Sequence, residues 1–350
     1  MLNKIVFITN RLIGGGSERV LVTLANSFYK KGYQVSIISF QKGETYQIEK
    51  GIKVYAIGGK NSKINHIKKI RKYVHMIKPD TVISFEYFVN MQVAVSCMGM
   101  KTNLIASERN DPSQRGGGFP TRIIRNMLYG LVDCLVCQTP DAKRYFPRRI
   151  QKKTLIIPNP IKEDLPIPWK GERKKRIVNF CRIEKQKNLH LLIDSFDEIR
   201  KKYHDYELVI YGDGTEKKDI IEYIKEKNAD GQIKIYPAEQ DVHRLVIDSK
   251  MFVSSSDYEG LSNSMIEAMA IGLPTICTDC PVGGARMMIK NGINGILVDV
   301  GDVNGMAAAM VRLIEDSKLS NELSINGAKI RERLCVNRIV GMWEEAMKRK

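Results

Sequence analysis

The chain has 350 residues, of which 43% are hydrophobic and 27% charged, and its formal net charge is +17. At about 150 residues per domain this length predicts two domains, and the composition excludes disordered, fibrous and coiled-coil proteins. No apolar run approaches the roughly 18 residues of a membrane-spanning helix. The start, Met1–Ile8, predicts a strand rather than a signal peptide, because no small-residue cleavage site follows. We therefore expect a cytoplasmic protein.

The positive charge is confined to the first half of the chain. Residues 1–160 contain 26 Lys and Arg against nine Asp and Glu, whereas residues 161–350 contain 30 of each. A basic field on one half predicts a polyanionic partner, either nucleic acid or an anionic membrane surface. The alternative is a lysine-rich solvated surface without a partner.

Short β-branched segments alternate with helix-length segments through both halves. In the first half this predicts helices at Ser17–Lys31 and Ile64–Lys78 and strands at Lys4–Thr9, Gln34–Phe40, Thr81–Phe85 and Asn103–Ser107. The stretch Lys162–Lys175, rich in Pro and charge, predicts a linker. Beyond it we expect strands at Arg176–Cys181, Glu207–Tyr211, Gln232–Tyr236, Met251–Ser255, Pro274–Thr278 and Ile296–Val300. The pattern predicts an α/β fold of two doubly wound parallel sheets, which bind ligands at the carboxyl ends of their strands.

The segment 111–130 interrupts this alternation. A glycine-rich stretch at 111–120 precedes a run in which Arg122 and Arg125 alternate with apolar residues. Basic and apolar residues beside a glycine hinge predict an interfacial element. An amphipathic core helix after a loop is the alternative.

Four of the seven cysteines form two pairs with the spacing of zinc ligands, Cys134/Cys137 and Cys277/Cys280. Residues three apart on a strand point to opposite faces, and free cysteines are usually buried. We therefore expect buried thiols, with neither a disulfide nor a metal.

A glycine turn, Gly14–Gly16, lies between the first strand and the first helix. Glycines allow close approach to a ligand, and a helix N-terminus favours an anion. A nicotinamide-binding fingerprint requires another glycine where Arg19 stands and an acidic residue where the second strand ends in Phe40 and Gln41. The missing features argue against a dehydrogenase, and a plain turn with Ser17 as helix N-cap is the alternative to a ligand-binding turn.

Two stretches in the second half carry residues suited to a sugar phosphate. Arg182 and Lys187 flank a strand-to-helix loop, from which both can reach one phosphate group. Glu259 follows another apolar strand, and the turn after it offers backbone N–H groups to a phosphate through Gly260, Leu261, Ser262 and Asn263. Glu267 lies in an apolar helix, where sugar hydroxyls are suitable partners for its carboxylate. A capping box with Ser264 is the alternative for Glu267.

In this order the motifs resemble a family 4 retaining glycosyltransferase of the GT-B type over nearly the whole chain. The matching segments are Gly14–Arg19, Cys181–Lys187 with Cys181 in place of the usual glycine, Tyr211–Gly214, Glu259 with Glu267, Gly283–Gly284, Asn294–Gly295 and Gly301–Asp302. Ser107–Pro112 and Asp257–Ser264 are similar to the bacterial branch that extends lipid-diphosphate-linked or surface-polysaccharide glycans.

The resemblance implies two Rossmann-like domains that face a cleft. Residues 1–160 would form the acceptor-side domain, residues 161–335 would bind the nucleotide-sugar, and a helix at 336–350 would cross back to the first domain. It also implies a UDP-sugar donor and neither a cofactor nor a metal ion.

The resemblance also implies roles for single residues. Arg182 and Lys187 would hold the donor diphosphate, Glu259 the hydroxyls of the donor sugar, and Glu267 the ribose. Gly15 and Gly16 would pack against the diphosphate or the sugar. Many members carry a histidine in the first domain, and here Glu108 or Arg109 would line the acceptor side instead.

The sequence thus predicts a retaining transfer of a hexose or N-acetylhexosamine from a UDP-sugar to a membrane-linked glycan. The basic first domain would be drawn to the inner face of the cell membrane, and no nucleic acid partner is expected. One alternative is a UDP-sugar epimerase of the same architecture. The other is a basic nucleic-acid-binding protein, although the chain lacks basic strands interleaved with aromatic residues.

Overall fold

The computed structural model describes residues 3–58, 62–114 and 118–349 and divides the chain into two compact units. Unit 1 comprises residues 1–160 and 336–350, and unit 2 comprises residues 161–335. Part of the predicted glycine hinge, residues 115–117, lies outside the described residues, as do Met1 and Leu2 of the chain start. None of the helices described is long and apolar enough to cross a bilayer.

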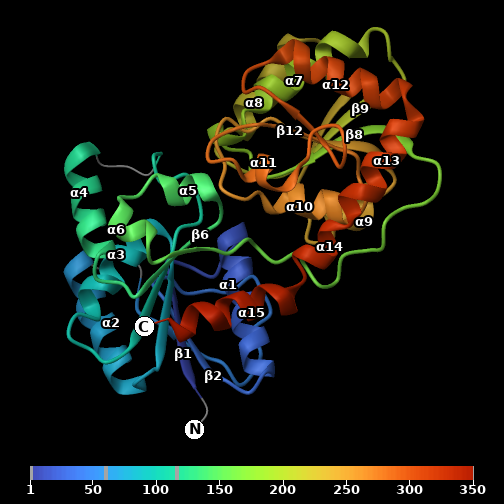
Figure 1. The fold of residues 1–350 in the computed structure, drawn as a ribbon. Helices are drawn as coiled ribbons and strands as arrows, with labels where there is room; N and C mark the ends of the chain where they lie inside the picture. The colour runs from blue at the N-terminus through green and yellow to red at the C-terminus, as the bar shows by residue number, and fades with distance from the viewer. Residues whose placement is uncertain (1–2, 59–61, 115–117, 350) are drawn as a thin grey trace. The chain divides into compact units, whose positions relative to one another are not determined.

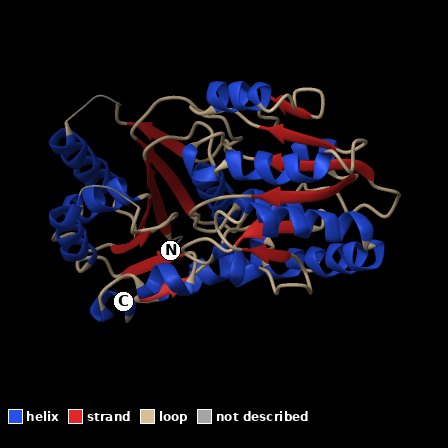
Figure 2. Cartoon of the chain, turned by 90° about the horizontal axis from the view of Figure 1, so that it is seen from above, coloured by secondary structure: helices blue, strands red, loops and turns tan. Residues whose placement is uncertain are grey.

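Unit 1 is built on a seven-stranded sheet in which all neighbouring strands are parallel, in the order β3-β2-β1-β4-β5-β6-β7. Helices cover both faces of the sheet (Figures 1 and 2). The strands are β1 Lys4–Thr9, β2 Gln34–Ser39, β3 Lys53–Ala56, β4 Thr81–Phe85, β5 Asn103–Ser107, β6 Cys134–Cys137 and β7 Thr154–Ile156. The helices are α1 Gly16–Lys30, α2 Lys63–Ile77, α3 Tyr87–Ser96, α4 Gly118–Tyr129, α5 Pro140–Arg144, α6 Arg148–Gln151 and α15 Val336–Lys348.

Unit 2 has a six-stranded sheet, again entirely parallel, in the order β10-β9-β8-β11-β12-β13. The strands are β8 Lys174–Phe180, β9 Glu207–Tyr211, β10 Ile233–Tyr236, β11 Ser249–Ser254, β12 Thr275–Thr278 and β13 Ile296–Val298. The helices are η1 Lys185–Lys187 (a 3₁₀ turn), α7 Leu189–Arg200, α8 Lys217–Glu226, α9 Val242–Val246, α10 Asn263–Ala270, α11 Gly284–Met288, α12 Val303–Glu315, α13 Ser317–Ala328 and α14 Ile330–Arg333. The prediction of two doubly wound parallel sheets is confirmed.

The last helix, α15, packs on unit 1 beside α1 (Figure 1). Trp343 is fully buried and stacks on Phe85 of β4 with a centroid distance of 5.8 Å. Lys31 and Glu344 add an ion pair of 2.7 Å at the edge of this contact. The chain therefore completes the core of unit 1 with its C-terminal residues.

Several elements differ from those predicted. The alternative of Ser17 as N-cap is wrong, because α1 begins at Gly16, and Gly15 takes the N-cap position with φ +107°. The Ser17 hydroxyl donates to Glu18 at 2.8 Å instead. The short edge strand β3 and the helix α3 were not expected. Because α3 is apolar on almost every side, its sequence lacks the periodicity that marks a surface helix.

Candidate active site

The loop that follows β8 is held against the turn that follows β9. The backbone N–H of Cys181 donates to the Tyr211 carbonyl at 3.1 Å. A Cβ atom on Gly212 would lie 2.1 Å from the Cys181 carbonyl oxygen, so a side chain at this position would clash with backbone. The glycine turn thereby fixes the backbone that carries Arg182.

Lys187 and Glu259 form a largely buried ion pair between the β8–α7 loop and the β11–α10 loop. Lys187 Nζ donates to Glu259 Oε2, and the two side chains are 11% and 20% exposed. Burial lowers the pKa of Lys187, but the neighbouring Glu259 carboxylate more than offsets this, and the net pKa lies above the usual value. Lys187 is therefore a cation at neutral pH, as a phosphate ligand must be.

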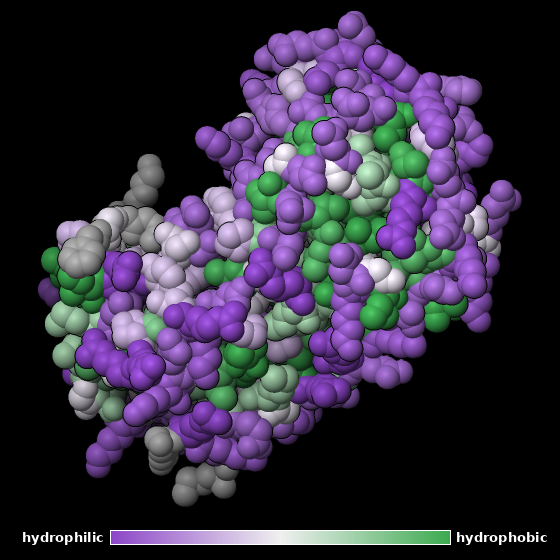
Figure 3. Space-filling view, turned by 45° about the horizontal axis from the view of Figure 1, so that its top comes forward, coloured by the Kyte–Doolittle hydropathy of each residue, from purple (hydrophilic) through white to green (hydrophobic). Residues whose placement is uncertain are grey.

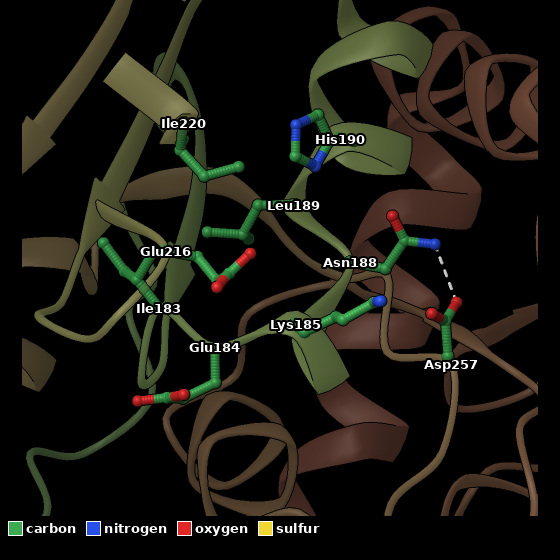
Figure 4. A pocket seen from close by; sticks show the side chains of 9 residues that line it. All are labelled: Ile183, Glu184, Lys185, Asn188, Leu189, His190, Glu216, Ile220 and Asp257. Carbon is green, nitrogen blue, oxygen red and sulfur yellow. Dashed lines mark hydrogen bonds between the residues drawn. The ribbon is translucent and has the colours of Figure 1, made fainter. Parts of the chain in front are cut away.

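Three further hydrogen bonds hold these two loops together. The Asn188 amide donates to Asp257 Oδ1 at 2.7 Å (Figure 4), and the Asp257 N–H donates to the Gln186 carbonyl at 3.0 Å. The Ser255 hydroxyl donates to the Lys187 carbonyl at 2.9 Å. The position of Lys187 relative to β11 is thus fixed by both backbone and side-chain contacts.

A pocket lies on the outer side of the same loop, between the first turns of α7 and α8 (Figure 4). Its apolar lining comes from Ile183, Leu189 and Ile220, and charged and polar side chains stand around it: Glu184, Lys185, Asn188, His190, Glu216 and Asp257. None of the residues that the sequence predicts as donor ligands lines this pocket. It is therefore separate from the candidate donor site.

Arg182 precedes Lys187 on the β8–α7 loop, and its side chain is exposed. Its guanidinium makes no hydrogen bond or ion pair with any residue that the structure describes. Arg182 stands five residues before Lys187 on the same loop, and the net pKa of Lys187 stays above the usual value despite this second cation. The loop thus carries one cation that is fixed by Glu259 and one that is available to an anion.

The turn formed by Gly260, Leu261, Ser262 and Asn263 leads from Glu259 into α10. Ser262 is the N-cap, and its hydroxyl accepts from the Met265 N–H at 3.4 Å. A Cβ atom on Gly284 would lie 1.8 Å from the Gly260 carbonyl oxygen, so α11 begins in direct contact with this turn. The predicted phosphate-binding turn therefore lies at a helix N-terminus, where the dipole favours an anion.

Glu267 is paired with a histidine that the sequence analysis did not single out. His243 Nε2 lies 2.9 Å from Glu267 Oε2, and each residue is only 5% exposed. The capping-box alternative for Glu267 is wrong, because α10 is capped two residues before Ser264, by Ser262. Glu267 thus binds a partner from another element rather than closing its own helix.

In unit 1, the glycine turn stands at the carboxyl end of β1. Gly16 opens α1, and the Gly15 carbonyl accepts from Tyr46 Oη at 2.9 Å. A Cβ atom on Gly15 would come within 2.5 Å of Glu18 Oε2. Glu18 is 3% exposed and accepts from Arg11 Nε at 3.1 Å. The turn therefore places a buried carboxylate directly behind Gly15.

Glu108 and Arg109 follow β5 at the same edge of the unit 1 sheet. The Tyr129 hydroxyl donates to Glu108, which is buried. Arg109 donates to the Asn159 side chain and stacks over Phe85, with 4.6 Å between the guanidinium carbon and the ring centroid. Burial lowers the pKa of Arg109. Both side chains are held in place by the fold of unit 1.

The predicted site residues thus form two groups, each at the carboxyl edge of its own sheet. Arg182, Lys187, Glu259, the turn 260–263 and Glu267 belong to unit 2. Gly15, Gly16, Glu108 and Arg109 belong to unit 1. Sequence reasoning missed His243 and gave no role to Asn188 and Asp257, because each acts by contacting a residue distant in the chain.

Three of the four paired cysteines lie on strands, Cys134 and Cys137 on β6 and Cys277 on β12. Cys280 lies in the loop that follows β12. Cys134 and Cys137 are fully buried in β6, and Cys277 and Cys280 are 2% and 3% exposed. Burial raises the pKa of Cys134 to about 11. Among the described residues, no three His, Cys, Asp or Glu side chains are grouped as metal ligands.

Two protein-family models match the chain. Residues 14–165 match "Glycosyltransferase Family 4", and residues 161–330 match "Glycosyl transferases group 1". A crystal structure of Anabaena HepE in complex with UDP-glucose has the same fold, with a TM-score of 0.87, 18% identity and coverage of 98% of this chain and 99% of that one.

Two curated relatives span nearly the same length. An "uncharacterized glycosyltransferase" of Haemophilus influenzae is 25% identical, with 97% of this chain and 98% of the relative covered. The second relative, from Campylobacter jejuni, is 28% identical, with 94% and 93% covered. It is named GalNAc-alpha-(1->4)-GalNAc-alpha-(1->3)-diNAcBac-PP-undecaprenol alpha-1,4-N-acetyl-D-galactosaminyltransferase.

Together the family models cover residues 14–330, which include the whole sheet of unit 2, every strand of the unit 1 sheet except β1, and all predicted site residues. Because both models describe glycosyltransferases, this match decides against the two alternatives, a UDP-sugar epimerase and a nucleic-acid-binding protein. The chain belongs to the family 4 glycosyltransferases of the GT-B fold, which as a family are retaining enzymes that require no metal ion.

Proposed function

We propose that this glycosyltransferase moves a hexose or an N-acetylhexosamine from a UDP-sugar to a membrane-linked glycan, a lipid-diphosphate or polysaccharide precursor. The observation that carries the proposal is the Lys187–Glu259 ion pair beside the exposed Arg182. Two cations and a carboxylate thus lie at the carboxyl edge of one sheet. The cations can bind a diphosphate, and the carboxylate can accept hydrogen bonds from the sugar bonded to it.

The reaction places negative charge on the diphosphate oxygen as the glycosidic bond breaks. Arg182 forks onto phosphate oxygens, and Lys187 adds a point charge, so both stabilise the leaving group more than the intact donor. Glu259 accepts hydrogen bonds from hydroxyls of the donor sugar. Because the diphosphate takes over Lys187 in part, the carboxylate of Glu259 becomes free to bind the sugar.

The remaining site residues bind other parts of the donor or line the acceptor side. Glu267 accepts from the ribose hydroxyls, and the backbone of the 260–263 turn supports the diphosphate. The backbone of Gly15 and Gly16 contacts the diphosphate or the sugar. Glu108 and Arg109 line the acceptor side, where the family's histidine is replaced.

The relatives support the choice of donor and acceptor class. The names of two Campylobacter jejuni relatives specify N-acetylgalactosamine transfer to glycans on an undecaprenol diphosphate, and the name of a Rhizobium meliloti relative specifies lipopolysaccharide core biosynthesis. The solved HepE structures were obtained with UDP or UDP-glucose. These matches favour a uridine nucleotide and a membrane-linked acceptor for this chain.

The charge of unit 1 supports contact with an anionic membrane at the inner face of the cell. Residues 1–160 and 336–350 contain 30 Lys and Arg and 11 Asp and Glu, whereas residues 161–335 contain 26 and 28. Unit 1 is thus strongly basic and unit 2 nearly neutral. A polybasic surface is attracted to anionic lipids at short range.

Helix α4 supplies an apolar contact for the same membrane surface. Ile123, Ile124 and Met127 are 44%, 53% and 61% exposed, and Arg122 stands exposed beside them. Figure 3 shows apolar side chains among the hydrophilic ones on the surface of the molecule. This composition favours the interfacial alternative for segment 111–130 over a core helix.

The inner face of α4 explains why its apolar residues point outward. Arg125 is 1% exposed, donates to the Pro112 carbonyl at 2.9 Å, and lies 4.9 Å from the Tyr145 ring centroid. Four residues on, the Tyr129 hydroxyl donates to Glu108. The helix therefore uses its polar residues to hold the acceptor-side loop and leaves its isoleucines for the bilayer.

Nucleotide binding followed by product analysis tests this function. A panel of UDP, GDP, ADP and CMP at equal concentration should raise the melting temperature only with UDP, because a ligand of the native state stabilises it. UDP-sugars that also stabilise the chain are then incubated with undecaprenol-diphosphate-linked acceptors in vesicles, and the anomeric configuration of the product is read by NMR. Stabilisation by another nucleotide but not by UDP would overturn the proposal.

A further inference from the structure

His243 and Glu267 form a buried polar contact between α9 and α10 of unit 2. His243 Nε2 lies 2.9 Å from Glu267 Oε2, and both side chains are 7% exposed. The imidazole also meets the ring of Phe180 edge-on, at 5.5 Å between centroids and 79° between planes. Phe180 ends β8, directly before the loop that carries Arg182. His243 therefore joins the helix of Glu267 to the strand that precedes the cationic loop.

The contact suits a ring N–H that donates to a carboxylate. An ionised carboxylate only accepts hydrogen bonds, so a contact with ionised Glu267 requires a protonated Nε2 that donates to it. Glu267 stands between Ile266 and Ala268, both fully buried, where an ionised carboxylate without a donor would be costly. A packing role alone would be met by an apolar side chain, but this site requires a donor.

We infer that His243 is a positioning residue for the ribose of the donor. Its hydrogen bond holds the Glu267 carboxyl group in one rotamer, so that the carboxylate accepts hydrogen bonds from the two vicinal ribose hydroxyls. This inference rests on the proposed function, because it takes the ribose contact of Glu267 from there. His243 acts only through Glu267 and touches neither the sugar nor the diphosphate.

Discrimination between UDP and 2′-deoxy-UDP measures this role directly. In the full-length chain we expect the Kd of UDP to be about tenfold or more below that of 2′-deoxy-UDP, the scale of one charge-assisted hydrogen bond. In His243→Leu the Kd of UDP should rise about tenfold, while the Kd of 2′-deoxy-UDP changes less than threefold. His243→Gln, which keeps an N–H donor, should recover part of the discrimination.

A double-mutant comparison and a matched control complete the experiment. In a Glu267→Gln background, His243→Leu should cause no further loss of discrimination. His204→Leu, which removes an exposed histidine from the same unit, should leave both Kd values unchanged. With a UDP-sugar, His243→Gln should raise the donor KM and leave kcat within about twofold, because the leaving-group cations remain in place.

The outcomes separate the inference from the proposed function. If His243→Leu and His243→Gln weaken UDP and 2′-deoxy-UDP by equal factors, His243 has a purely structural role and the inference is wrong. If the wild-type chain binds both nucleotides equally well, Glu267 does not contact the 2′-hydroxyl and the inference also fails. If the wild-type chain binds no uridine nucleotide, the proposed function itself is wrong.

Discussion

The ammonium of Lys187 binds the carboxylate of Glu259 across two loops whose residues are 72 positions apart in the chain. Each partner offsets part of the free energy that burying the other would cost. The pair therefore sets an ammonium beside a carboxylate at the carboxyl edge of the sheet. In the proposed reaction the donor diphosphate replaces the carboxylate in part as the anionic partner of Lys187.

Lys187→Ala is expected to reduce kcat by about 10²–10³-fold, because removal of one electrostatic contact to developing charge has this effect. The substitution also leaves Glu259 without its partner, so the melting temperature should fall. Steady-state rates at saturating donor, together with thermal denaturation, measure both effects. Lys202→Ala, which breaks the exposed Lys202–Glu315 pair of 2.9 Å, is the matched control and should change neither. A Lys187→Ala enzyme with near-normal kcat contradicts the assigned role.

Arg182→Ala is the cleaner probe of the diphosphate site. The Arg182 side chain is exposed and has no partner among the described residues, so its loss should leave the melting temperature within about 1 °C. Turnover should still fall about 100-fold. Arg182→Lys should restore part of it, because lysine supplies the charge without the planar fork. Equal rates for all three enzymes would show that Arg182 does not contact the leaving group.

The sequence was sufficient to predict two parallel sheets and the loops that carry the candidate site, although not the edge strand β3. Parallel strands that are buried on both faces are continuous apolar runs, and the strands Lys4–Thr9, Thr81–Phe85 and Asn103–Ser107 have their predicted bounds. The predicted residues at the carboxyl ends of these and later strands follow from the same rule. Sheet topology thus carried most of the information about where the site lies.

Contacts between segments that are distant in the chain could not be predicted from the sequence. His243 lies on a five-residue helix without periodicity, and its partner Glu267 is recognisable only once α9 and α10 are packed together. Helix α4 is a second example. The periodicity of its sequence reveals two faces, but it does not show which face packs against the rest of unit 1. The aromatic rings and the Pro112 carbonyl around Arg125 decide that the face with Arg125 and Tyr129 is the buried one.

Ile124→Glu is expected to weaken binding to anionic vesicles about tenfold or more, because it removes one exposed apolar side chain and adds a negative charge. Sedimentation with phosphatidylglycerol vesicles at low salt measures the partition. Ile325→Glu, at a residue that is 66% exposed on α13 of unit 2, is the matched control and should keep wild-type binding. Equal binding by both variants would exclude α4 from the membrane contact.

The unfolding free energy should fall as pH rises above about 8.5, because buried thiols resist ionisation. Burial raises the pKa of Cys134 to about 11, whereas an unfolded thiol ionises near 8.5. Between these values the unfolded chain has lost a proton that the native chain keeps, so each such thiol lowers stability by up to about 1.4 kcal/mol per pH unit. Urea unfolding between pH 8 and 10.5 under reducing conditions measures the slope. Cys134→Ala should make it shallower and Cys335→Ala, a partly exposed thiol, should not.

Trp343→Ala is expected to lower the unfolding free energy of unit 1 by about 3–5 kcal/mol, the usual cost of truncating a fully buried aromatic side chain. The loss includes the stacking on Phe85, by which α15 is fixed to β4. None of the described residues accepts a hydrogen bond from the Trp343 indole N–H, so Trp343→Phe keeps the stacking, removes an unsatisfied donor and should cost less than half as much. Trp169→Ala, at a residue that is 41% exposed, is the matched control and should stay within about 0.5 kcal/mol of wild type. If Trp343→Ala and Trp169→Ala unfold at the same urea concentration, α15 does not contribute to the core of unit 1.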